Sequence, residues 1–169
     1  MALFTVDCEN FNHGLHIVNR GHQSDIIWLL NKLEQYNIKS IFYVLGDWIK
    51  ENPEKYIILK KSRHILKSHG VHHYYDEKGD RSPYFNQEGL PGLCGGFFFR
   101  ILPLWLIKFE IWRTGMFFIH PHDLDEDHPK IKNWWFNWKR HVGLKTARKK
   151  LECLLREVSW DEASQQVKS

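Results

Sequence analysis

Residues 3–9, LFTVDCE, combine a mostly apolar run with two carboxylates directly after it. The run from Leu3 to Val6 predicts a short buried strand. Asp7 and Glu9 stand two positions apart, so on an extended segment their side chains point to the same side. Ligands of α/β proteins bind beyond the carboxyl ends of strands, which makes this pair a candidate for chemistry.

Predicted strands and helices alternate along the rest of the chain. Three further apolar, β-branched or aromatic runs predict strands, at 40–45, 64–67 and 116–119. Four segments with helical spacing or capping signals predict helices, from Ser24, from near Pro53, over 103–115 and over 144–158. The glycine- and proline-rich stretch from Asp76 to Gly96 predicts a long loop. This alternation favours an α/β fold built on a parallel sheet or barrel.

The length of 169 residues fits one domain, which we place at 1–160, followed by a frayed tail at 161–169. The three cysteines are far apart and odd in number, which indicates a reducing compartment rather than a disulfide framework. No secretory signal opens the sequence, so a cytoplasmic location is expected. The most apolar later stretch, 92–112, is interrupted by charges and a proline; it predicts no transmembrane helix, although it can lie on a membrane surface.

A basic stretch lies toward the C-terminus, where eight lysines and arginines fall between 130 and 150 without an intervening acid. Such a face can attract an anionic partner, but a solvated surface is the simpler interpretation. No recognised motif supports nucleic-acid binding, so no nucleic-acid partner is expected. Four aromatic residues interleave with these charges: Trp134, Trp135, Phe136 and Trp138. We expect them to be partly buried, with one or two lining a cleft.

An acidic pattern in DLDEDHPKIKNW, residues 123–134, has aspartates at alternate positions, as a calcium loop does. The calcium loop also requires a glycine at its sixth position and a closing glutamate at its twelfth. Here those positions hold His128 and Trp134. We therefore exclude a calcium site of this type.

Polar side chains follow four predicted strand ends: Asp7 and Glu9, His69 and His73, Arg81, and His120. His69 and His73 are four positions apart, which on a helical turn lets both rings reach one ion. Together with Glu9 they form a common ligand set for catalytic Zn²⁺. Asp7 is then placed to take a proton from the attacking water. Arg81 can orient Asp7, and His120 can donate a proton to a leaving group.

Five segments of the chain, in order, resemble the motifs of the polysaccharide deacetylases of the NodB type, the fourth carbohydrate-esterase family: TVDCEN, IKSIFYVLGDWI, RHILKSHGVHH, DRSPYF and FFIHPHDLDEDHP. Within that family the chain is most similar to the branch that acts in bacterial polysaccharide biosynthesis. The resemblance implies a distorted (β/α) barrel and the hydrolysis of N-acetyl groups on amino sugars.

The resemblance also implies roles for individual residues. Asp7 would be the catalytic base, His120 the general acid and Arg81 the residue that orients Asp7. Glu9, His69 and His73 would hold a divalent metal ion, with zinc expected and cobalt as the alternative. Tyr84 and Phe85 would contact the substrate, an N-acetylated glycan or amino sugar, with a backbone N–H near Tyr84 stabilising the oxyanion.

The chain departs from the family pattern in two places. Cys8 stands where many members have a second aspartate, so the ligand role passes to Glu9. The span from Arg81 to Gly96 is shorter than usual, and no match to the fourth motif is evident. We therefore expect an abbreviated barrel that lacks a strand and a helix, or a cleft that a neighbouring subunit of a homo-oligomer closes.

Two other function classes compete with a deacetylase. A non-catalytic carbohydrate-binding or assembly module could keep the fold and the metal site for stability alone. A nucleic-acid-binding protein could use the basic stretch, and its affinity would fall steeply with salt and survive chelation. The set of candidate acid, base and ligand residues favours the enzyme, because a binding module needs neither an acid nor a base beside a metal.

Overall fold

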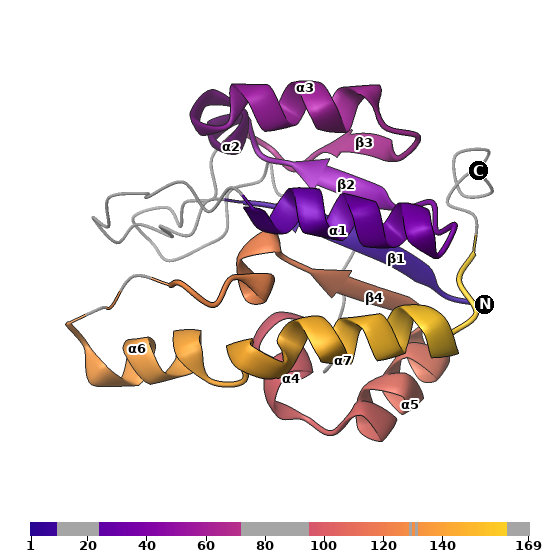
Figure 1. The fold of residues 1–169 in the computed structure, drawn as a ribbon, viewed down its shortest axis with the longest axis vertical. Coiled ribbons are helices and arrows are strands. Elements are labelled where there is room, and N and C mark those ends of the chain that lie inside the picture. Colours follow the sequence, from indigo (N-terminus) through magenta and orange to yellow (C-terminus); the bar gives the residue numbers. More distant parts are fainter. Residues whose placement is uncertain (10–23, 72–94, 129, 131, 162–169) are drawn as a thin grey trace.

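A computed structural model describes residues 1–9, 24–71, 95–128, 130 and 132–161. This part of the chain contains one sheet of four parallel strands, in the order β3-β2-β1-β4 (Figure 1). The strands are β1 Leu3–Cys8, β2 Ile41–Val44, β3 Ile65–Ser68 and β4 Met116–Ile119. Each predicted strand is confirmed to within two residues at either end.

Strand β1 is the centre of the sheet because it pairs with a strand on each side. Val6 lies opposite Phe42 of β2 and opposite Ile119 of β4. All six residues of β1 are buried, as expected for a parallel strand covered on both faces. The strand runs two residues further than the sequence predicted, so Asp7 lies within it.

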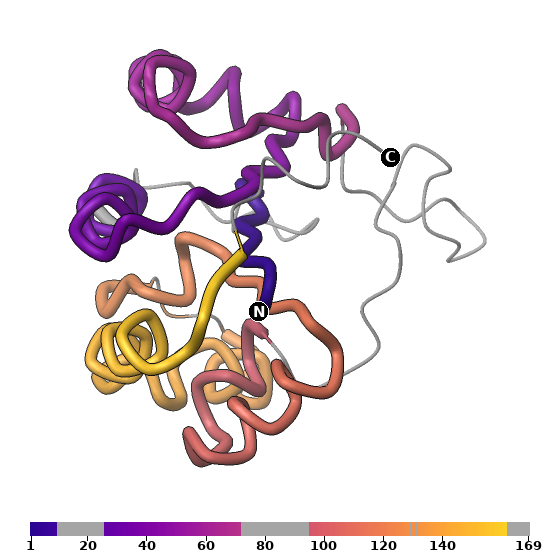
Figure 2. Tube along the Cα trace, turned by 90° about the vertical axis from the view of Figure 1, so that its right-hand side faces the viewer, coloured from indigo at the N-terminus to yellow at the C-terminus, as the bar shows by residue number. Residues whose placement is uncertain are grey.

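Helices connect and cover the strands. Their bounds are α1 Ser24–Gln35, α2 Gly46–Glu51, α3 Pro53–Lys61, α4 Gly96–Ile101, α5 Leu104–Thr114, α6 Trp134–His141 and α7 Leu144–Glu157, with a 3₁₀ turn η1 at Pro121–Leu124. In Figure 2, α1, α3 and α7 lie on the same side of the sheet. The sequence predicted α1, α3, α5 and α7 but not the short helices α2, α4 and α6.

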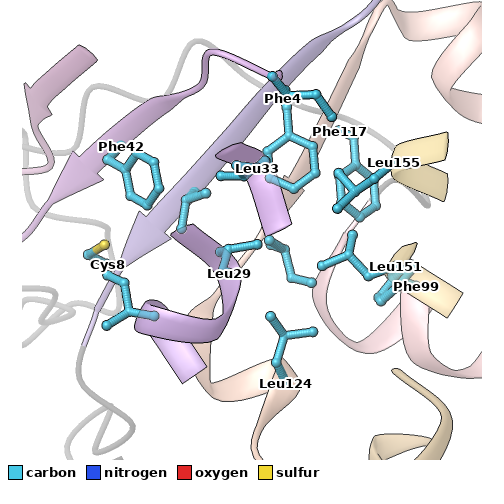
Figure 3. Close-up of a cluster of buried hydrophobic side chains, with 14 of the residues drawn as sticks. Phe4, Cys8, Leu29, Leu33, Phe42, Phe99, Phe117, Leu124, Leu151 and Leu155 are labelled. Carbon is cyan, nitrogen blue, oxygen red and sulfur yellow. The ribbon is translucent and has the colours of Figure 1, made fainter. Parts of the chain in front are cut away.

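The main hydrophobic core lies between the sheet and these helices (Figure 3). Phe4 and Phe117 come from adjacent strands, and their ring centroids are 5.3 Å apart. Leu29 of α1 and Leu151 of α7 pack into the same cluster, and both are fully buried. Alternate strand residues, among them Leu3, face the other side of the sheet in a smaller apolar cluster. This α/β arrangement, with a four-stranded parallel sheet, is consistent with part of a (β/α) barrel, so the predicted fold class is confirmed.

The aromatic side chains of α6 correct one prediction. Their sequence pattern predicted partial burial, whereas Trp134 is 76% exposed and Trp138 is 45% exposed. No residue of α6 is buried. In Figure 1 the helix lies at one end of the molecule, apart from the sheet, so its rings have no core to enter.

The end of the described chain is tied to its beginning. The backbone N–H of Ala2 donates to the carbonyl of Ser159 at 2.9 Å, and that of Asp161 donates to the carbonyl of Ala2 at 2.8 Å. The predicted tail lies almost wholly outside the described residues, and the single-domain boundary stays a prediction. Among the helices of the described residues, none is long and apolar enough to span a bilayer.

His64, between α3 and β3, provides a test of the fold through pH. Its ring is buried against Phe42, and its Nδ1 accepts a hydrogen bond from the backbone N–H of Ser40 at 3.2 Å. Burial, and then the positive charge of Arg63, lower the pKa of His64 to about 4. The unfolded chain, with an ordinary pKa of about 6.5, therefore binds a proton between these values that the folded chain does not.

We therefore expect the contribution of neutral His64 to the free energy of unfolding to be fully present above about pH 6.5. This contribution should be lost progressively as the pH is lowered toward 4. The matched variant is His64→Asn, which can keep an acceptor for Ser40 but cannot titrate. Between pH 7 and 4.5 the wild type should lose roughly 2–3 kcal/mol more unfolding free energy than the variant, measured by urea denaturation. Equal losses in the two proteins would show that His64 does not carry this dependence.

Candidate metal and acid–base site

Three strand ends bring four of the predicted site residues to one edge of the sheet. Asp7 lies near the end of β1, and Glu9 follows that strand by one position. His69 follows β3, and its backbone N–H donates to the carbonyl of Val44 at 3.0 Å. His120 follows β4 on the opposite side of β1. The parallel direction of the strands is what makes these ends meet.

The carboxylate of Glu9 lies between two imidazoles. Its Oε1 is 3.3 Å from Nε2 of His69 and 3.3 Å from Nε2 of His120. Glu9 is 7% exposed and His69 is 1% exposed. A buried carboxylate therefore has a histidine from each flank of the sheet beside it.

Asp7, Glu9 and His120 form a group that fits a divalent metal ion. One potential ligand atom from each residue lies within 4.8 Å of the others. Two carboxylates and an imidazole suit Zn²⁺ and related ions, and His69 adds a second imidazole beside Glu9. A second group of this kind among the described residues consists of His120, His122 and Asp123, and it shares His120 with the first.

Asp123 fixes the ring of His120. The turn η1 begins at Pro121 and brings the Asp123 carboxylate back to His120, the residue before the turn. Oδ2 of Asp123 accepts from the backbone N–H of His120 at 3.2 Å and lies 3.0 Å from its Nδ1. Burial by itself lowers the pKa of His120, but the charge of Glu9 and the hydrogen bonds to Asp123 and Glu9 outweigh it and raise the pKa well above its usual value.

Arg100 of α4 supports Asp123 from behind. Its Nε is 3.1 Å from Oδ1 of Asp123, and both side chains are almost completely buried. Its two terminal nitrogens donate to three carbonyls around the end of α6, those of Lys139, Arg140 and Val142, at 2.8–3.2 Å. One guanidinium thus joins α4, η1 and α6. A hydrogen bond to a charged, buried group of this kind is costly to remove.

Cys8 lies between the two carboxylates in sequence but not in space. Residues of a strand alternate between faces, and Cys8 is fully buried in the main core, on the helix side of the sheet (Figure 3). Burial, followed by the charges of Asp7 and Glu9, raises the pKa of the Cys8 thiol well above its ordinary value. The thiol is therefore neutral and packs as an apolar side chain.

The structure brings together Asp7, Glu9, His69 and His120, and their roles remain predictions. His73, Arg81, Tyr84 and Phe85 lie outside the described residues.

Two residues of the site were missed in the sequence. Asp123 was considered only as part of a calcium loop, although its position three residues after His120 is a local signal. Arg100 was taken as an interruption of the apolar run FFFRIL. A lone charge inside such an apolar run is the sequence signal that could have identified Arg100, because a charged side chain is rarely buried without a partner.

Two family models match the chain. The model for polysaccharide deacetylase matches residues 19–87, which include His69, His73 and Arg81. The model for a domain of unknown function, DUF3473, matches residues 87–168, which include His120. The searches of curated proteins and of solved structures found no match.

Replacing Arg100 tests its role in holding the site. Arg100→Met would leave the buried carboxylate of Asp123 without its cation, so we expect a loss of about 3–5 kcal/mol in unfolding free energy. The matched control is Arg156→Met, whose guanidinium is exposed and paired with Glu157, and we expect no measurable change in its unfolding free energy. Equal effects in urea denaturation would contradict the role assigned to Arg100.

Proposed function

Since the chain belongs to the polysaccharide deacetylase family, as a short member of it, we propose that it is a metal-dependent hydrolase acting on N-acetylated amino sugars. The substrate would be a glycan or a glycan precursor, and the product would be the free amine and acetate. One observation carries the proposal: two carboxylates and two histidines converge on a buried site at one edge of the parallel sheet.

Glu9 and His69 would hold the ion, together with His73, which the sequence places four residues after His69. Zinc suits this set best, and cobalt is the alternative. When bound, a divalent ion supplies Lewis acidity and an activated water at neutral pH. The low exposure of Glu9 and His69 supports a ligand role, because ionisable side chains are costly to bury and cluster at sites where they bind or react.

Asp7 and His120 would handle the two protons of the reaction. Asp7 accepts a proton from the water that adds to the acetyl carbonyl carbon. The carbon–nitrogen bond then breaks, and His120 donates a proton to the departing sugar amine. Because Nδ1 of His120 faces Asp123, the donation would come from Nε2, which lies 3.3 Å from Oε1 of Glu9. Arg81 would orient Asp7, as the resemblance implies.

The substrate would lie over this sheet edge, beside Tyr84 and Phe85, with the backbone N–H near Tyr84 stabilising the oxyanion. An abbreviated barrel leaves one side of such a cleft without a wall. A second copy of the chain in a homo-oligomer is one way to close it.

Three single variants separate the proposed roles. His69→Ala should lose bound metal, measured by elemental mass spectrometry after zinc loading and dialysis. Asp7→Asn and His120→Ala should keep the metal but release acetate from N-acetylglucosamine oligomers about 10²–10⁴ times more slowly. Asp47→Asn, a carboxylate on α2 that pairs with Lys50, is the matched control and should behave as the wild type.

The outcomes discriminate between functions. Loss of metal in His120→Ala would make His120 a ligand rather than the acid, as its grouping with Asp7 and Glu9 allows. A wild type that holds zinc and binds the oligomers but releases no acetate would overturn the enzyme and favour the carbohydrate-binding module.

A further inference from the structure

An exposed aromatic surface runs across α4 and α6. Its members are Phe97, Phe98, Trp134, Trp135 and Trp138. Except for Phe97, which is partly covered, these side chains are 42–76% exposed. Large aromatic side chains usually contribute to cores or interfaces, so a contiguous exposed group marks a surface that something else covers.

Ring contacts show that this aromatic surface is continuous. Starting from Trp134, neighbouring ring centroids are 5.8 Å apart to Trp135, 5.2 Å on to Trp138, 6.1 Å on to Phe97 and 5.6 Å on to Phe98. The rings of Trp135 and Trp138 stack on each other at 22°. Each of these two rings therefore covers part of one face of the other, and less ring face remains for stacking on bases or sugars.

Helix α6, which carries the three tryptophans, is held in place at both ends, although none of its residues is buried. At its start, the side chain of Asn133 accepts hydrogen bonds from the backbone N–H groups of Trp135 and Phe136. At its end, Arg100 binds three carbonyls. Caps of this kind stabilise a helix without burying it. The exposure of the rings is thus part of a fixed structure.

Positive charge borders the aromatic surface. Five lysines of α6, of α7 and of the segment that leads into α6 are exposed: Lys130, Lys132, Lys139, Lys145 and Lys149. The sequence has no acidic residue from 128 to 151, although the exposed Glu126 and Asp127 come just before this stretch. The ammonium of Lys139 lies 5.5 Å from the ring centroid of Phe97, which joins the charge to the rings.

We propose that this aromatic surface docks on a membrane surface that contains anionic lipids. Tryptophan and phenylalanine side chains are favourable at the boundary between headgroups and acyl chains, where lysines can reach lipid phosphates. Each lysine near an anionic bilayer adds attraction. This combination of mutually packed rings with exposed lysines fits a lipid surface better than a nucleic acid, for which open ring faces are needed.

The test uses the full chain and sedimentation with vesicles. Wild type should bind vesicles of phosphatidylcholine and phosphatidylserine at 7:3 far better than pure phosphatidylcholine, and salt should weaken this binding. The double variant Trp134→Ala, Trp135→Ala should bind at least tenfold more weakly. Lys139→Gln and Lys145→Gln should each weaken binding about fivefold.

The matched control is the double variant Trp105→Ala, Trp112→Ala. These two side chains of α5 are 69% and 79% exposed, but the nearby Lys108 and Arg113 are neutralised by Glu157 and Glu110. Its vesicle binding should equal that of the wild type. Circular dichroism should show native helix content in every variant, because none of the replaced side chains is buried.

Three results would overturn the proposal. One is the absence of binding to the anionic vesicles. Another is equal binding by the wild type and the Trp134, Trp135 double variant. The third is concentration-dependent self-association in sedimentation velocity that this double variant abolishes, which would assign the surface to a second copy of the chain. The proposal is independent of the proposed enzymatic function.

Discussion

The parallel pairing of β1 with β2 on one side and β4 on the other is the constraint on which the described structure depends. Val6 is matched in register with a residue of each neighbour, and every residue of β1 is buried. Parallel pairing sends the carboxyl ends of the strands to one edge, so Glu9 meets His69 and His120 there. An antiparallel β4 would place His120 at the opposite edge.

A chain of buried polar contacts extends from this edge to the surface. Glu9 contacts His120, His120 is fixed by Asp123, and Asp123 is paired with Arg100. Arg100 in turn holds the end of α6, where the exposed aromatic rings lie. In a low-dielectric interior each of these charges depends on its neighbour. One guanidinium therefore orients both the proposed acid and the proposed membrane-docking helix.

Much of this architecture could be predicted from the sequence, because buried strands and amphipathic helices have strong periodic patterns. α7 is an example: helical spacing predicted a helix over 144–158, and Ala147 and Leu151 of this helix are buried. Strand ends also located Asp7, Glu9, His69 and His120. α6 was missed because its apolar residues pack against no core. Asp123 was missed because its contact requires the turn η1, and the position of β4 beside β1 depends on pairing between distant segments.

We propose that the edge of the sheet at Glu9 holds a metal ion. Anomalous diffraction at the zinc edge, from crystals of zinc-loaded protein, would locate that ion. We expect a peak within about 2.3 Å of Glu9 and His69 side-chain atoms, and the loss of that peak in Glu9→Gln. Absence of any peak, or a peak beside His122 and Asp123 without Glu9, would contradict it.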